Sequence, residues 1–190
     1  IQLDLHLGFE NSTDIFEIYL KETNDDRYLA PSPDGQNLKL CWTLGAALRY
    51  GLVRCLGINS EEVGIIVRPA RLSGGMLAYA ICLYDTSARG AGFSTLAPQY
   101  LTEIFEKAAE LLACPAKCQN ACENCLLEHD TRHHAHLLDR NMALEYLKTV
   151  GKWLSLQPSD QLLGGKSKYC FQDLWQEMRD WRKSFGQRAA

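Results

Sequence analysis

The sequence has no nucleotide-binding motif: its 190 residues contain neither a Gly-x-x-x-x-Gly-Lys-Ser/Thr loop nor an Asp-Glu-x-His-like box. No apolar run reaches the roughly 20 residues that a membrane-spanning helix needs, and no signal peptide opens the chain. The formal net charge of −3 gives no global attraction to nucleic acid, so DNA binding would need a local patch. We therefore expect a cytoplasmic chain that is not itself an ATP-driven enzyme.

The cysteine content is high but does not predict a disulfide scaffold. Three of the eight cysteines, Cys41, Cys55 and Cys82, lie inside apolar runs, where a free thiol behaves as a small buried hydrophobe. The apolar fraction of 46% is enough for a sizeable core. The length fits one domain with an appendage, and because the chain begins at Ile1 in strand-like sequence we expect it to be part of a longer protein.

Four cysteines lie within a dozen residues, separated by three, three and two positions: Cys114, Cys118, Cys122 and Cys125. This spacing folds the backbone back so that four sulfurs can meet, and Zn²⁺ prefers a tetrahedral set of thiolates. A closed four-cysteine site leaves no position for substrate, so the spacing favours a structural zinc. An iron–sulfur cluster and a pair of disulfides remain as alternatives.

Hydrophobic periodicity predicts an α+β fold, with helices packed on a small antiparallel sheet and the four-cysteine zinc knuckle between helices. Gly57 is placed to cap a helix at its C-terminal end, and Gly45 and Gly51 inside that helix suggest close approach of another backbone. We expect a zinc-binding domain over residues 1–150, then a linker and an amphipathic helix in 151–190. The predicted elements are two short strands within 1–20, a hairpin of strands 63–67 and 77–84, and helices 40–56, 94–112, 137–150 and 170–185.

Several carboxylates invite a nuclease interpretation, because paired carboxylates can hold Mg²⁺. Asp14, Glu17 and Asp85 lack the lysine of the strand-borne Asp…Glu-x-Lys arrangement, so capping and turn roles are favoured. The glycines of residues 90–92 form a strand-to-helix turn, whose following helix N-terminus is an alternative anion site. We favour the interpretation that these glycines permit the turn and tight packing.

The polar stretch after the cysteines contains four histidines, at positions 129, 133, 134 and 136. Because four thiolates already complete a tetrahedral site, we expect these histidines to be solvated or to be outer-shell partners of the metal. Arg132 and Arg140 flank the histidines and make this the best candidate patch for a phosphate backbone. A salt bridge to a neighbouring acid is the alternative for Arg140.

Three pieces of sequence together resemble the MrfA-like zinc-binding domain. They are residues 13–18, the Tyr-Asp-Thr of 84–86 with the Gly-Ala-Gly-Phe of 90–93, and the cysteine cluster followed by the Leu-Leu-Asp-Arg of 137–140. This family lies at the C-terminal end of bacterial superfamily 2 DNA helicases and occurs in antiphage proteins such as the DrmB subunit of DISARM. The resemblance covers roughly residues 1–150, and it implies that the four cysteines are the zinc ligands.

The resemblance also implies a role. The ATPase activity of such helicases lies in separate motor lobes, so this chain is expected to be a non-catalytic domain that braces the motor and helps to guide single-stranded DNA, in DNA repair or antiphage defence. Its expected partners are the motor lobes of the same or a partner chain and single-stranded DNA, with no membrane. The alternatives are a protein–protein interaction module of a defence complex, which would use an apolar face at residues 175–181, and an iron–sulfur domain.

Overall fold

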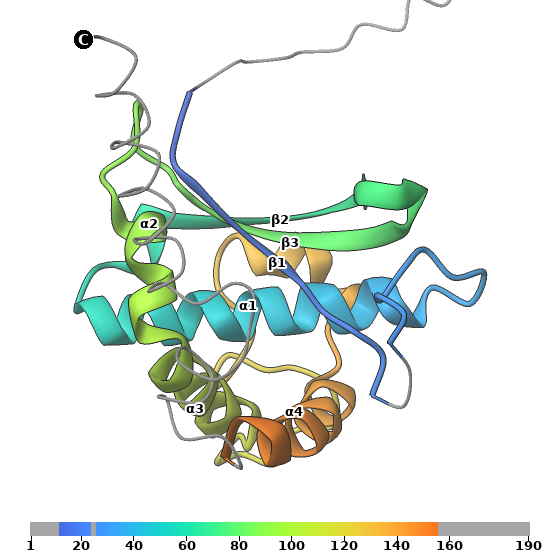
Figure 1. Ribbon diagram of the computed structural model, residues 1–190. Helices are drawn as coiled ribbons and strands as arrows, with labels where there is room; N and C mark the ends of the chain where they lie inside the picture. Colours follow the sequence, from blue (N-terminus) through green and yellow to red (C-terminus); the bar gives the residue numbers. More distant parts are fainter. Residues whose placement is uncertain (1–11, 24–25, 156–190) are drawn as a thin grey trace, which may run out of the picture. The chain divides into compact units, whose positions relative to one another are not determined.

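The computed structural model describes residues 12–23 and 26–155, and its described residues up to Lys148 belong to one compact unit (Figure 1). The fold is α+β, as predicted. Three antiparallel strands, β1 (Ile15–Tyr19), β2 (Val63–Arg71) and β3 (Leu77–Asp85), form a sheet in the order β1-β3-β2. Among the described residues, no helix is long and apolar enough to span a membrane.

The sheet has two different faces, and the pairing register of its central strand β3 shows which residues lie on each. Its residue Leu83 pairs with Ile65 of β2 and Phe16 of β1, and this row lies on the face that packs against helix α1. Its neighbour Cys82 pairs with Ile66 and Glu17, and this row points the other way because side chains alternate along a strand. The face turned away from α1 therefore carries half-exposed apolar residues, including Ile15 at 53% and Ile66 at 47% exposure.

Helix α1 (Gln36–Leu56) is the centre of the core, and it is buried on nearly all sides. It packs on the sheet through one face and on helix α3 through another, so Leu44, Leu48 and Leu52 are fully buried (Figure 1). The helix ends where predicted: Gly57 adopts a left-handed conformation with φ 67°, and its N–H donates to the Val53 carbonyl.

The remaining helical segments follow the hairpin. They are η1 (Ser60–Glu62), η2 (Ser73–Gly75), α2 (Phe93–Leu96), η3 (Ala97–Tyr100), α3 (Leu101–Leu112), η4 (Thr131–Leu137) and α4 (Arg140–Ser155), where η marks a 3₁₀ turn. The cysteine cluster lies between α3 and α4, which confirms its predicted place between two helices. Asp139 caps the N-terminus of α4, because its carboxylate accepts the N–H groups of Asn141 and Met142 at 3.0 and 3.1 Å.

Several predicted boundaries are wrong: the helix predicted from residue 40 begins at Gln36, and the strand predicted over 63–67 continues to Arg71. The single helix expected over 94–112 is divided at η3, where Pro98 lacks the N–H that a continuous helix would use. The helix expected from residue 137 begins at Arg140 instead, after the 3₁₀ turn η4. The expected strand in residues 1–11 and the expected helix 170–185 lie outside the described residues, and the division into domains 1–150 and 151–190 stays a prediction.

Candidate metal centre

The backbone between α3 and α4 makes a tight knuckle that presents four thiols. Cys114 lies two residues after the end of α3, and it adopts a positive φ of 39°. The chain then turns back through Lys117, whose φ is 48° and whose N–H donates to the Cys114 carbonyl at 2.9 Å. A second turn closes when the Cys125 N–H donates to the Cys122 carbonyl at 3.0 Å. Two successive turns thus bring together side chains from four positions.

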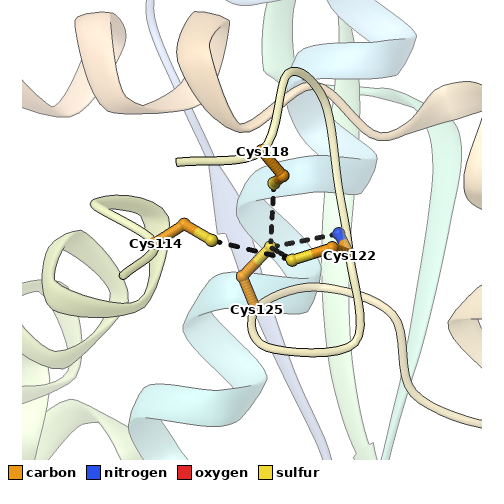
Figure 2. Close-up of side chains that lie close together, drawn as sticks. All are labelled: Cys114, Cys118, Cys122 and Cys125. Atoms are coloured by element: carbon orange, nitrogen blue, oxygen red, sulfur yellow. Dashed lines mark hydrogen bonds between the residues drawn. The ribbon is translucent and has the colours of Figure 1, made fainter. Parts of the chain in front are cut away.

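The four sulfurs converge on one point (Figure 2). The Sγ–Sγ distance is 3.7 Å for the pairs Cys114–Cys122, Cys118–Cys125 and Cys122–Cys125. All four Sγ atoms lie within 4.8 Å of one another. Cys114 and Cys125 are buried, whereas Cys118 and Cys122 are half-buried, so the centre lies just below the surface.

These distances fit one tetrahedral ion. With Zn–S bonds of about 2.3 Å, ideal tetrahedral geometry separates the sulfurs by about 3.8 Å. A disulfide needs sulfurs about 2.05 Å apart, so none of these pairs is bonded. A four-iron cluster gives each thiolate its own iron and therefore spreads the sulfurs farther than one ion does. The donor set and its spacing fit a mononuclear tetrathiolate site better than either alternative.

The thiols do not ionise equally without a metal. A backbone hydrogen bond from Cys118 lowers the pKa of Cys114 to about 6, against the opposing effect of burial. Burial raises the pKa of Cys118 and raises that of Cys125 to about 12. Only a thiolate binds the metal, so loading this site must release protons, and metal affinity should fall as the pH is lowered.

The start of α4 is tied to the knuckle by hydrogen bonds to its backbone. The Arg140 side chain is buried, and it donates from Nε to the Cys118 carbonyl at 2.5 Å and from Nη1 to the Leu112 carbonyl at 3.1 Å. Of the two arginines that the sequence suggested for a phosphate-binding patch, Arg140 points inward and Arg132 is exposed. The alternative of a salt bridge for Arg140 is wrong, since within the described residues its side chain bonds carbonyl groups rather than an acid.

Arg132 lies on the surface, as predicted. Its guanidinium donates to the Glu123 carboxylate at 2.8 Å, and the two side chains are 60% and 75% exposed. An ion pair this exposed contributes little to stability and leaves Arg132 accessible to another anion. The histidines lie apart from the sulfurs: His134 stacks on Trp42 with ring centroids 3.9 Å apart, and His129, His133 and His136 are exposed.

A buried arginine that sequence reasoning missed connects the chain after the knuckle to the core. Arg49 of α1 is 3% exposed, and its guanidinium pairs with Glu128 and Asp130, immediately beyond the last cysteine. A cavity of about 530 Å³ borders this ion pair and is also lined by His129 and Tyr84. Position 49 falls on a helix that is buried all round, so the only sequence signal was an arginine amid apolar neighbours.

We expect the double variant Glu128→Ala with Asp130→Ala to lower the free energy of unfolding by about 2 kcal/mol, because it leaves a buried guanidinium unpaired. The cost is below that of a fully buried pair, since the carboxylates are 33% and 50% exposed. Denaturant unfolding at pH 7 measures it. The comparison variant Arg49→Met, which removes the buried charge itself, should lose less, and an equal loss in the two would contradict this account.

The effect should depend on pH. Burial acts to raise the pKa of Asp130, but the hydrogen bond and charge of Arg49 outweigh it and hold that pKa below its usual value. A carboxyl group whose pKa is lowered by folding stabilises the folded state at pH values above its unfolded pKa of about 3.9. This contribution is lost as the pH falls through the folded-state pKa. The difference between wild type and the double variant should therefore be full at pH 7 and shrink below about pH 4.

The carboxylates considered for a nuclease do not converge on a metal position in the structure. Asp85 is fully buried, and its carboxylate accepts the N–H groups of Ala91, Phe93 and Ser94 at 2.7 to 3.0 Å. The capping role predicted for it is confirmed. These bonds also occupy the amides after the glycine turn, so the protein's own carboxylate fills the position considered for an external anion. Glu17 instead bonds the Tyr19 hydroxyl and Arg68.

A comparison with protein families bears on this centre. Residues 44–126 match the family model of the MrfA Zn-binding domain, which confirms the resemblance seen in the sequence. The matched segment runs from α1 to just beyond Cys125 and so contains all four cysteines. A comparison with curated proteins gives no match.

One solved structure is similar, the crystal structure of the DUF1998 helicase MrfA bound to DNA. Its TM-score is 0.47 and its sequence identity is 18%, over 63% of this chain. The chain spans only 15% of the length of that helicase.

Proposed function

We propose, on the premise that residues 44–126 form an MrfA Zn-binding domain, that this chain is the structural-zinc accessory domain of an MrfA-type DNA helicase. Zn²⁺ is bound by Cys114, Cys118, Cys122 and Cys125. The observation that carries this proposal is the convergence of four sulfurs at tetrahedral spacing inside the matched segment. A closed tetrathiolate site has no open position, so the domain contributes a rigid element and no catalytic step of its own.

The mechanical part of the proposal is bracing of the motor lobes. The knuckle connects α3, which packs on the central helix α1, to the start of α4, so the bound ion fixes the relation between two helices that are otherwise joined by a loop. The sheet face turned away from α1 supports a protein contact, because Ile15 and Ile66 are half-exposed there. The parent protein's role in DNA repair or antiphage defence is part of the same proposal.

The second part is guidance of single-stranded DNA, for which Arg132 is the candidate contact. We expect Arg132→Gln to weaken binding of a labelled single-stranded oligonucleotide several-fold and to lower the slope of log affinity against log salt by about 0.7. Titrations of the 190-residue chain at two salt concentrations measure both quantities. The slope is informative because each phosphate contact releases counterions, so the loss of one contact lowers the slope. A general loss of structure weakens binding without this specific change in slope.

Lys107→Gln is the matched control for this titration. Lys107 also makes an exposed ion pair, with Glu110 at 2.9 Å on α3, so the variant removes the same charge and one comparable pair. Affinities that fall equally in the two variants would indicate net charge rather than a contact at Arg132. Absence of salt-dependent binding by the wild type would favour the alternative, in which the domain is a protein–protein interaction module.

A further inference from the structure

Three consecutive carbonyl groups of the knuckle are bonded by the first two residues of α4. Arg140 Nε donates to the Cys118 carbonyl at 2.5 Å, Asn141 Nδ2 to the Gln119 carbonyl at 2.6 Å, and the Arg140 backbone N–H to the Asn120 carbonyl at 2.8 Å. A surface loop normally leaves such groups to water. Here the segment that contains the second cysteine is held at each of three successive residues.

Arg140 reaches both ends of the first half of the knuckle. While Nε bonds the Cys118 carbonyl, Nη1 bonds the carbonyl of Leu112, the last residue of α3. Cys114 follows two residues after Leu112, so a single planar guanidinium fixes the chain on either side of the first two cysteines. The fork geometry of arginine suits this bridge, and the single ammonium of lysine does not reproduce it.

The surroundings of Arg140 also compensate its buried positive charge. The residue is 8% exposed, and a buried guanidinium is costly unless it is compensated. Its described hydrogen bonds go to carbonyls, one of them at the C-terminal end of α3, where the helix dipole favours a cation. Four thiolates around one Zn²⁺ would add a charge of −2 next to it.

We propose that Arg140 is a positioning residue of the metal centre, which holds Cys114 and Cys118 at ligand spacing and serves as the buried countercharge of the tetrathiolate. The inference rests on the proposed zinc site. Outer-shell partners of a metal contribute about 10- to 100-fold to its affinity, and the bridge made by Arg140 touches the backbone of one ligand and the helix that presents another.

The test measures metal affinity and metal geometry separately. Zinc affinity is determined by competition with a chromophoric chelator, and the coordination geometry is read from the absorption spectrum of the Co²⁺-substituted protein at saturating metal. We expect Arg140→Gln to weaken zinc binding about 10- to 100-fold and to alter the Co²⁺ spectrum. Arg140→Lys keeps the charge without the fork, so it should bind zinc with intermediate affinity.

Two controls separate positioning from simple destabilisation. Arg132→Gln removes a guanidinium eight residues earlier that bonds only an exposed acid, and it should leave zinc affinity and the Co²⁺ spectrum unchanged. Ile65→Val in the sheet core lowers stability away from the metal, so it should leave the Co²⁺ spectrum unchanged even where it weakens apparent affinity through folding. The inference is overturned if Arg140→Gln keeps the wild-type spectrum and loses no more affinity than a core variant of equal stability loss.

Two further outcomes are decisive. If Arg140→Gln does not fold even with zinc, Arg140→Lys decides: a wild-type affinity and Co²⁺ spectrum in that variant would overturn the inference. A wild-type protein that binds no zinc would overturn the proposed metal centre itself. That result is distinguishable from failure of the Arg140 inference alone, in which the wild type binds zinc tightly and the variants do so equally well.

Discussion

Removal of the metal is expected to unfold the domain rather than to inhibit a reaction. The free energy of binding a structural zinc is about 10–16 kcal/mol, which is as large as the whole stability of a typical domain, about 5–15 kcal/mol. The sulfurs clamp a knuckle that contains two non-glycine residues with positive φ, Cys114 and Lys117, and these conformations need external support. Chelation should therefore abolish the cooperative thermal transition seen by circular dichroism.

Cys122→Ser tests the same claim without a chelator. Cys122 lies 3.7 Å from two other sulfurs, so its loss leaves three ligands and opens the site to water. We expect loss of bound zinc and a thermal transition that is lowered by tens of degrees or absent. Zinc content and melting are measured on the same sample. A variant that melts like the wild type, or that keeps one equivalent of zinc, would contradict a structural metal.

Cys55→Ser is the matched control. Cys55 is also a half-buried free thiol, but it belongs to α1 and lies outside the four-sulfur cluster. The same change of sulfur to oxygen should leave zinc content unchanged and cost little stability. If both serine variants lost the metal, the effect would come from general destabilisation of the thiol-rich protein rather than from the removal of one ligand.

The features that the sequence predicts correctly are those that depend on the spacing of nearby residues. The four cysteines, the hairpin of β2 and β3, and the capping glycine Gly57 each depend on residues close together in the chain. The α+β class followed from the same local patterns. Spacing alone also favoured a single tetrahedral ion over disulfides, and the sulfur positions bear this out.

The features that it missed depend on contacts between distant segments. Arg49 pairs with Asp130, 81 residues away in the sequence, and Arg140 bonds Leu112, 28 residues away. No local pattern therefore predicts either contact. The sequence suggests a phosphate contact or a salt bridge for Arg140, because the carbonyl groups that it bonds belong to segments distant in the chain. Its place at the first residue of α4, against the knuckle, is a property of the tertiary fold.

The contact of α1 with α3 gives the second prediction with a large effect. The sequence predicts close approach of another backbone at Gly45 and Gly51 of α1. The structure confirms it at Gly51, whereas the prediction is wrong at Gly45, whose near neighbours are side-chain atoms. A Cβ added at Gly51 would lie 2.4 Å from the carbonyl oxygen and 3.0 Å from the carbonyl carbon of Ile104 in α3. Backbone atoms of a helix cannot turn aside as a side-chain tip can, so alanine at this position must push the two helices apart.

We expect Gly51→Ala to lower the free energy of unfolding by roughly 3 kcal/mol, even though alanine favours a helix over glycine by about 1 kcal/mol. Denaturant unfolding with saturating zinc measures the loss. The displacement should also reach the metal centre, because α3 ends at Leu112, two residues before the first cysteine. Zinc affinity should therefore fall together with stability.

Gly45→Ala in the same helix is the matched control. The new Cβ there would lie 2.9 Å from Cγ2 of Ile65 and 3.2 Å from Cγ2 of Ile81, which are side-chain methyl groups rather than backbone atoms. The gain in helix propensity is the same at both positions, so the difference between the variants isolates the clash with a backbone. We expect Gly45→Ala to cost less than about 1 kcal/mol. Equal losses in the two variants would mean that α3 moves away from the new Cβ as easily as two methyl groups do. The contact between α1 and α3 would then not be rigid enough to position the first cysteine.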